Sequence, residues 1–401
     1  MLQALIESVS LALMHFRRTA PLFAVLIALL ASDLPAQRKK KPVSDDEGYI
    51  PVVAPETKQK KKKDEDATQT LPPPKELPSA VTAESDRLAF GVSPLGGKGL
   101  LSQQTRDALK ALLRVNHGTI VKLRAFVAGS GDLRRVAELV GETFTEKHLP
   151  LPVLTVVQVG ALPMEGAQVV LESVETDKKV VNPHGVAFLA GQNATSVAQS
   201  LARLKMALRG GGMDAEDVLR VTCFVSSLEE QRDTHHLMTA GFPGAVLNYV
   251  QMQREPVTPA AECEAVARLR TPPTGPVSFV NPADLDKSPN YSQLALVRSP
   301  RLVITGTQLA FGSQEGDIKL AFERLQRVLT ASNARFDQLV MSHTYVTSSA
   351  IIPRVRTVRA GYYSGANPPA STLLPFESLP SLDASFGVDV IAATDSASAR
   401  R

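Results

Sequence analysis

The sequence predicts an α+β protein in which one structural design occurs three times in tandem between residues 81 and 395. Three observations predict it: amphipathic helical rows, apolar strands that follow each row, and an acidic residue in each closing strand. Each unit is expected to be a β-hairpin followed by β-α-β-α-β-β, with its helices on one face of a sheet. The predicted units are residues 81–176, 177–272 and 273–395.

Each unit contains a row of apolar residues at the three-to-four spacing of one buried helix face. The rows are Leu109, Leu112 and Leu113 in the first unit, Leu201, Leu204 and Leu208 in the second, and Phe322, Leu325 and Leu329 in the third. A strand rich in Val, Phe and Thr follows each row, over residues 122–127, 221–225 and 342–346. The distance from Leu201 to Phe224 equals that from Phe322 to Tyr345, 23 residues in each case, which places these two units in one register.

The closing strands of the units continue this register. Each contains one acid, which is Glu172, Glu264 or Asp389. The residues 18 positions earlier are Leu154, Val246 and Ser371, and each lies in a predicted strand that starts near a proline. Three units with one spacing favour a common fold over coincidence.

The N-terminal segment 1–36 resembles a secretory signal. Arg17 and Arg18 precede an apolar run over residues 20–31, and Leu34 to Gln37 offer a cleavage site. Met14 is an alternative start. A membrane anchor is the other interpretation, although the run is shorter than the roughly 20 residues of a spanning helix. We therefore expect export to the periplasm, the cell envelope or the medium, without a stable membrane span.

Residues 37–80 are predicted to be a disordered charged and proline-rich linker, and residues 396–401 a short tail. The formal charge of +4 is divided equally between residues 37–80 and residues 81–401, and the latter carry 32 basic and 30 acidic side chains. A nearly neutral body argues against nucleic acid as a partner.

The third unit contains four short motifs in order: Ser288–Gln293 (SPNYSQ), Thr305–Gln308 (TGTQ), Pro369–Thr372 (PAST) and Gly387–Ala392 (GVDVIA). In these motifs residues 276–394 resemble the Rid (YjgF) family, whose pattern is S-P-x-Y-S-Q, S-G-Q, P-A-R-[ST] and E-x-E-A-x-A. Many members hydrolyse reactive enamines and imines. The resemblance implies a chorismate mutase-like unit and, over three units, an intramolecular pseudo-trimer that remains monomeric. Ser371 departs from the pattern, because it stands where the family has arginine.

The resemblance also implies site residues. It makes Asp389, Glu264 and Glu172 candidates for the acid that activates water, although an edge carboxylate in solvent is the alternative for each. Tyr291, Thr305 and Ser371 are implied to bind substrate; Tyr291 could instead be an interface anchor. Arg356, on the predicted second helix, is a candidate replacement for the missing arginine, and a surface arginine is the other interpretation.

Cys223 and Cys263 are the two cysteines of the chain, and both fall in predicted strands of the second unit. Either a disulfide or two buried thiols fits this placement. The adjacent pair His235–His236 points in two directions on a helix, so no metal site is predicted. Gly210–Gly212 lacks the following Lys-Ser/Thr of a phosphate-binding loop, and no cofactor is expected.

Two functions fit the sequence. The first is an exported Rid-like protein that binds a small molecule or a partner in clefts between its units, without the family's carboxylate-binding arginine. The alternative is an enamine or imine deaminase that hydrolyses a reactive imine to a carbonyl compound and ammonia. Whether the chain is an enzyme is left open by the residues, since Leu154, Val246 and Ser371 all lack the guanidinium group.

Overall fold

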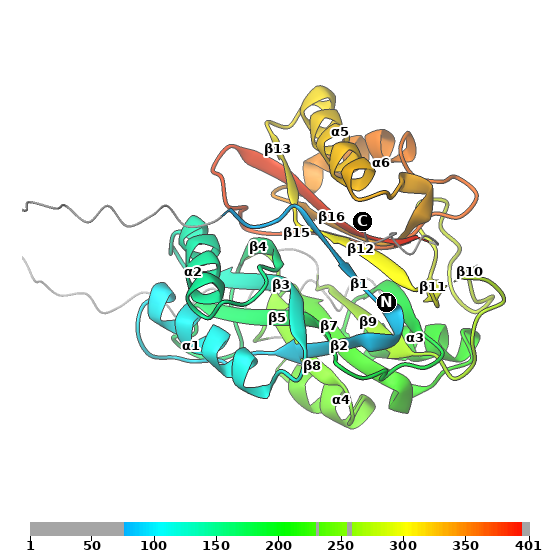
Figure 1. The fold of residues 1–401 in the computed structure, drawn as a ribbon, viewed down its shortest axis with the longest axis horizontal. Coiled ribbons are helices and arrows are strands. Elements are labelled where there is room, and N and C mark those ends of the chain that lie inside the picture. The colour runs from blue at the N-terminus through cyan, green and yellow to red at the C-terminus, as the bar shows by residue number, and fades with distance from the viewer. Residues whose placement is uncertain (1–75, 230–231, 255–258, 395–401) are drawn as a thin grey trace, which may run out of the picture. The chain divides into compact units, whose positions relative to one another are not determined.

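The computed structural model describes residues 76–229, 232–254 and 259–394. These residues form a mixed α+β fold with three sheets, as Figure 1 shows, and confirm the α+β class of the prediction. The predicted signal segment, most of the predicted linker and the predicted tail lie outside the described residues. Within the described part of the chain, no helix is both long enough and apolar enough to cross a bilayer.

The first sheet has the strand order β2-β5-β3-β4. Its elements are β2 (Leu88–Val92), α1 (Leu101–Val115), β3 (Thr119–Ala128), α2 (Leu133–Glu146), β4 (Val153–Val159) and β5 (Val169–Thr176). β3 is parallel to β4 and antiparallel to the closing strand β5. The predicted row on α1 is confirmed by the burial of Leu109 and Leu112 against this sheet.

The second sheet has the order β10-β11-β6-β9-β7-β8. Its elements are β6 (Val186–Ala194), α3 (Val197–Gly210), β7 (Val218–Val225), α4 (Thr234–Gly241), β8 (Val246–Gln251), β9 (Ala261–Arg268), β10 (Val277–Val280) and β11 (Leu294–Val297). β7 is parallel to β8 and antiparallel to the closing strand β9, as in the first sheet.

The third sheet has the order β1-β12-β16-β14-β15, and β13 also pairs with β16. Its elements are β1 (Ala80–Ala83), β12 (Arg301–Thr305), β13 (Gln308–Phe311), α5 (Glu315–Ala331), β14 (Leu339–Val346), α6 (Ile352–Ala360), β15 (Ala370–Pro375) and β16 (Ala384–Thr394). The same pattern recurs, since β14 is parallel to β15 and antiparallel to β16. Short 3-10 turns lie at Ser85–Arg87, Ala215–Asp217, Phe336–Gln338 and Ser349–Ile351.

The strands at the start of each predicted unit pair differently from the hairpins that the sequence predicts. β10 and β11 form a hairpin, but β11 continues into β6 of the second sheet and does not pair with β12. The chain passes to the third sheet through Ser299, whose hydroxyl donates to the carbonyl of Thr394 (2.7 Å). β1 joins the third sheet beside β12, which ties the start of the described chain to its end (Figure 1).

Each sheet buries one face under its own pair of helices. α1 and α2 pack on the first sheet, α3 and α4 on the second, and α5 and α6 on the third. The opposite faces meet in two central apolar clusters, each built from all three sheets. One of them contains Phe224 of β7, whose ring lies edge-on to Phe126 of the first sheet (5.9 Å) and Phe376 after β15 (5.7 Å).

A disulfide joins Cys223 and Cys263, which face each other on the paired strands β7 and β9. This decides between the two possibilities that the sequence left open. Both side chains are fully buried on the helix-covered side of the second sheet.

Phe224→Ala should lower the free energy of unfolding by about 3–5 kcal/mol, because it opens a cavity where the three sheets meet. Phe224→Leu, which keeps most of the volume, should cost clearly less. Urea unfolding followed by circular dichroism measures both. A loss below about 1 kcal/mol for Phe224→Ala would contradict the packing of the three sheets around this ring.

Candidate functional site

The three acids predicted to be catalytic lie together in a buried ionic layer between the two central apolar clusters. Each comes from the closing strand of a different sheet. Glu172 and Glu264 are 1% exposed and Asp389 is 0% exposed. The ionic layer consists of these acids and three cations, Lys122, Arg124 and Arg220.

Arg124 connects the acids of the first and second sheets. Its Nη2 donates to Glu172 (2.6 Å) and to Glu264 (2.7 Å), and its Nε donates to Glu172 (2.9 Å). Lys122, two residues earlier on β3, donates to Asp389 of the third sheet. The first sheet thus provides the cations that neutralise acids of both neighbouring sheets.

Three further hydrogen bonds run from sheet to sheet in a cycle. In each sheet the donor lies on the last parallel strand, and its acceptor is the acid of another sheet. The bonds are Thr155 Oγ1 to Asp389 (2.7 Å), Asn248 Nδ2 to Glu172 (2.7 Å) and Thr372 Oγ1 to Glu264 (2.6 Å). The first sheet donates to the third, the second to the first, and the third to the second.

The ionic layer holds its acids in the charged form. Burial, the largest single effect, raises the pKa of Glu172 and Glu264, but Arg124, Arg220 and the hydrogen-bond partners together lower both pKa values. Burial also opposes ionisation of Asp389, yet Lys122 lowers its pKa far below the ordinary range. Carboxylates with such strong counter-ions are poor proton acceptors at neutral pH.

The space beside the ionic layer is too small for a substrate. The cavity that Arg124, Glu172, Glu264 and His343 help to line has a volume of about 20 Å³. That is room for about one water molecule. The geometry therefore gives the three acids a structural role as counter-ions. A catalytic role for them stays a prediction.

Thr305, predicted to bind substrate, is fully buried within the third sheet. Its hydroxyl accepts a hydrogen bond from the amide of Val390 (3.0 Å). This bond joins β12 to β16. Thr305 does not line the cleft described next.

The structure brings together the other three predicted binding residues, Tyr291, Ser371 and Arg356. They line a cleft of about 550 Å³ between the second and third sheets. Tyr291 lies on the loop before β11, Ser371 on β15 and Arg356 on α6. A cleft of this size suits a small molecule.

Glu262 on β9 is the acid of this cleft, and the sequence analysis did not select it. It is 8% exposed, and its hydrogen-bond partner is Asn193 Nδ2 at 3.5 Å. Gly191, in a bulge of β6, makes room for it: a Cβ atom there would lie 2.0 Å from Glu262 Oε1. The backbone of β6 thus lies so close to the carboxyl that only glycine fits at position 191.

Arg359 is a second group that the sequence analysis did not select. It lies one helical turn after Arg356 on α6, is 4% exposed, and donates through Nη1 to Ser371 Oγ (3.1 Å). Its Nη2 donates to the carbonyl of Asn290 (3.4 Å). Among the described residues no carboxylate lies within ion-pair distance of Arg359. The guanidinium is therefore buried beside Ser371 with neutral partners only.

Burial acts on the ionisation of both groups. Burial raises the pKa of the Glu262 carboxyl to about 8, and the charge of Glu264 acts in the same direction. Burial lowers the pKa of Arg359, which nevertheless stays protonated at neutral pH as arginine does. Burial, and next the charge of Glu262, raise the pKa of Tyr291. An unpaired cation and a neutral acid thus line one cleft.

Sequence signals for these residues existed. The segment Glu262–Ala265 contains two acids in an E-x-E-A pattern, and counting from the closing-strand register selected the second one, Glu264. Arg359 shares one side of α6 with Arg356 at a spacing of three residues.

The predicted register of the second unit needs one correction. Leu247, not Val246, occupies the place of Leu154 and Ser371, because one residue fewer separates Leu247 from Glu264.

Comparison with known proteins identifies part of this fold. Residues 283–394 match the model of a family described as endoribonuclease L-PSP. No curated protein matches the chain. The chain is similar to solved structures that include a Rid-family protein of unknown function from Yersinia pestis, at 20% identity and a TM-score of 0.29. That match covers 30% of this chain and 100% of the other.

Two further solved structures are similar in extent. One is RidA from the Antarctic bacterium Psychrobacter sp. PAMC 21119, with 16% identity, a TM-score of 0.22, and coverage of 23% of this chain and 80% of that chain. The other is a YjgF-family protein from Neisseria meningitidis, with 11% identity, a TM-score of 0.23, and coverage of 30% and 97%.

The described residues form an α+β fold with a cleft between its second and third sheets. Residues 283–394 match this family model, and the match supports the Rid-family assignment that the motifs of the third unit predicted.

Arg124→Met should lower the free energy of unfolding by about 3–5 kcal/mol, because it leaves Glu172 and Glu264 buried without their cation. Arg135→Met breaks an ion pair with Glu142 in which each side chain is 35% exposed, and should cost less than about 1 kcal/mol. Chemical unfolding at pH 7 compares the two variants. Equal losses of unfolding free energy in the two variants would contradict the structural role assigned to the ionic layer.

Glu262→Gln should stabilise the protein at alkaline pH. A carboxyl whose folded pKa is about 8 binds a proton that the unfolded chain releases above its ordinary pKa of 4.5, so stability falls as pH rises between these values. The glutamine variant lacks this loss and should be more stable above pH 8, by up to about 5 kcal/mol. Thermal unfolding from pH 4 to pH 9 measures the difference; parallel curves for both proteins would refute it.

Proposed function

We propose that the chain joins three Rid-like units in one polypeptide and that the cleft between the second and third units binds a small molecule bearing a carboxylate. The recurring strand order and the cycle of hydrogen bonds from sheet to sheet support three equivalent units around a common centre. Joining the units in one chain keeps them together at any dilution.

The class of ligand is inferred from the buried side chain of Arg359. A buried guanidinium without a carboxylate partner among the described residues is costly unless a ligand supplies the anion. A ligand carboxylate would accept charge-assisted hydrogen bonds from Arg359, with Ser371 and Tyr291 beside it. Arg356, exposed on the same side of α6, adds positive charge at the entrance.

Hydrolysis of an imine or enamine is the second candidate, and Glu262 favours it. A carboxyl with a pKa of about 8 exchanges protons near neutral pH. In its ionised form it would take a proton from a water molecule that attacks the carbon of the C=N bond. The same proton would pass to the nitrogen and give a carbinolamine. The hydroxyl proton of the carbinolamine would then move to the nitrogen as the C–N bond breaks, so that an imine and water give a carbonyl compound and ammonia.

Comparison of equivalent strand positions in the three sheets predicts one active cleft per chain. The positions equivalent to Glu262 are Val170 in the first sheet and Gly387 in the third. The positions equivalent to Ser371 are Leu154 and Leu247. The other two interfaces therefore lack both the acid and the hydroxyl. We expect one ligand per chain.

We also propose that the protein is exported. The disulfide between Cys223 and Cys263 supports an oxidising compartment such as the periplasm or the medium. The segment proposed as the export signal lies outside the described residues.

Isothermal titration with pyruvate tests the binding proposal. One site per chain is expected, and Arg359→Gln should weaken binding at least 30-fold, since a buried charge contact is worth about 2–5 kcal/mol. Arg356→Gln, at an exposed position on the same helix, should change affinity less than about tenfold. Three equal sites, or equal effects of the two variants, would contradict the proposal.

The hydrolase candidate is tested with freshly generated 2-iminopropanoate. Glu262→Gln should lower kcat about 100-fold or more while pyruvate binding persists, because it removes the proton acceptor and not the carboxylate anchor. If wild-type protein binds pyruvate but does not exceed the buffer rate, the cleft is a binding site without this activity.

A further inference from the structure

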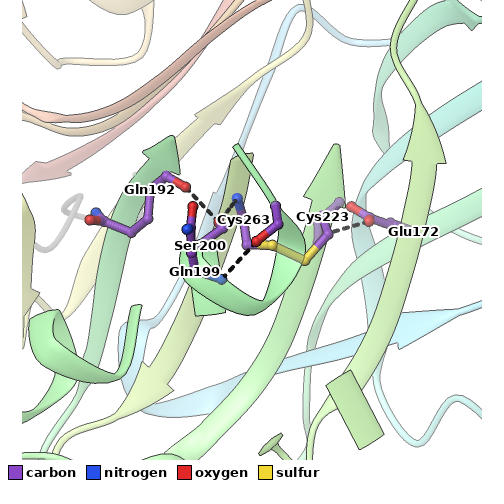
Figure 2. The surroundings of a disulfide bond; sticks show 8 residues. Glu172, Gln192, Gln199, Ser200, Cys223 and Cys263 are labelled. Atoms are coloured by element: carbon purple, nitrogen blue, oxygen red, sulfur yellow. Dashed lines mark hydrogen bonds between the residues drawn. A yellow bond between two sulfur atoms is a disulfide. The ribbon is translucent and has the colours of Figure 1, made fainter. Parts of the chain in front are cut away.

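The disulfide lies directly behind the strand that presents Glu262. Cys263 is the residue between Glu262 and Glu264, and its side chain points to α3 while the two acids occupy the opposite face of β9. Cys223, its partner, lies on the neighbouring strand β7 (Figure 2). The covalent bond therefore fixes β9 to β7 next to the cleft acid.

A chain of hydrogen bonds continues from Cys263 toward the cleft loop. The amide of Cys263 donates to Ser200 Oγ of α3 (2.9 Å), and Ser200 Oγ donates to the carbonyl of Gln192 on β6 (2.5 Å). Figure 2 shows Ser200 next to Cys263 and Gln192. Gln192 Nε2 donates to Gln293 Oε1 (2.8 Å), two residues after Tyr291.

Gln293 holds the loop that carries Tyr291. Its Nε2 donates to the carbonyl of Asp286 (2.8 Å), and its backbone carbonyl accepts from the amide of Ala190 (3.0 Å). Gln293 is 1% exposed and Gln192 is 2% exposed. Buried amide pairs of this kind are rigid, because an unpaired amide in the interior is costly.

These contacts matter because ordinary sheet pairing is interrupted at the cleft. The register between β6 and β9 shifts between Leu189 and Gln192, at the bulge that contains Gly191. The ladder that would otherwise align β9 with β6 is therefore irregular beside Glu262. The disulfide and the Ser200 bonds supply the alignment from the other side of β9.

We propose that closure of the Cys223–Cys263 disulfide positions Glu262 and the Tyr291 loop, so that the cleft gains its binding geometry only when the two thiols are oxidised. Cys223, Cys263 and Ser200 are positioning residues that act through β9 and Gln192. The inference rests on the proposed function of the cleft. It implies that the reduced chain, as made before export, holds a cleft of lower affinity.

The oxidation step is thiol–disulfide exchange. The thiols of Cys223 and Cys263 lose two protons and two electrons as the S–S bond forms, and a disulfide-bearing oxidant of the compartment accepts both pairs and becomes a dithiol. Both sulfur atoms are buried in the folded chain. Closure therefore belongs to folding, before α3 covers the strands.

The test compares oxidised wild-type chain, chain refolded with dithiothreitol, and the double variant Cys223→Ala/Cys263→Ala. Carboxyl ¹³C NMR follows the titration of Glu262, assigned with Glu262→Gln. The groups that face this carboxyl are Arg356 and Arg359 of α6, Tyr291 of the loop and Glu264 of its own strand. These groups remain in all three proteins, so a change in titration reports the position and hydration of Glu262.

In the reduced chain and the double variant, the pKa of Glu262 should move toward its ordinary value by about one unit or more as water enters. Amide hydrogen exchange over residues 286–293 should accelerate, and pyruvate affinity should fall about tenfold through lost preorganisation. Unchanged titration and unchanged exchange in both proteins would overturn the inference, whatever pyruvate does. Absence of pyruvate binding in every form would instead refute the proposed function alone.

Ser200→Ala separates positioning from loss of stability, because it keeps the disulfide and removes the bonds to Cys263 and Gln192. It should reproduce part of the shift in the Glu262 titration and part of the faster exchange over residues 286–293. Ser196→Ala is the matched control: Ser196 caps the same helix by accepting from the amide of Gln199 (3.4 Å) and touches neither partner. Equal results for the two serine variants would overturn the relay through Ser200.

Discussion

The neutralisation of three buried carboxylates is the constraint on which the rest of the structure depends. Glu172, Glu264 and Asp389 come from three different sheets, and the acids of the second and third sheets are paired with cations of the first sheet. The first sheet contributes two of the cations, Lys122 and Arg124, whereas Asp389 depends on Lys122 from another sheet. Since an unpaired buried charge costs several kcal/mol, separating the sheets would leave the acids of the second and third sheets without these cations. The ionic layer thus specifies assembly, and the apolar clusters on both sides of it supply the burial energy.

The candidate cleft uses the same strand for a different purpose. Glu264 and Glu262 lie two residues apart on one face of β9, but Glu264 meets Arg124 while Glu262 meets a neutral amide and open space. Pairing lowers one pKa and burial raises the other, so adjacent acids of one strand differ in protonation at neutral pH. A pKa raised so far, for a carboxyl that lines a cleft, makes Glu262 a candidate functional residue.

Some strands extend a sheet other than the one next to them in the sequence, and these strands link the sheets within one chain. The β10–β11 hairpin precedes the third sheet in sequence but extends the second, and β1 extends the third. The loop before β11 is thereby placed against the second sheet, where Tyr291 faces Glu262 and Ser371. The interfaces between the sheets differ in their residues: one has Ser371, and the other two have Leu154 and Leu247 at the same register position.

The sequence by itself determined the α+β class, the buried helical rows such as Leu325 and Leu329, and the Rid motifs of the third unit, because periodicity and short motifs are local properties of the chain. It also selected Tyr291, Ser371 and Arg356, which share the cleft. Only the tertiary structure decided which acid lines the cleft, since Glu262 and Glu264 are equivalent in pattern and differ in what other sheets bring to them. The same holds for Arg359, whose place beside Ser371 depends on how α6 packs, and for the partner of β11, which depends on competition among sheet edges.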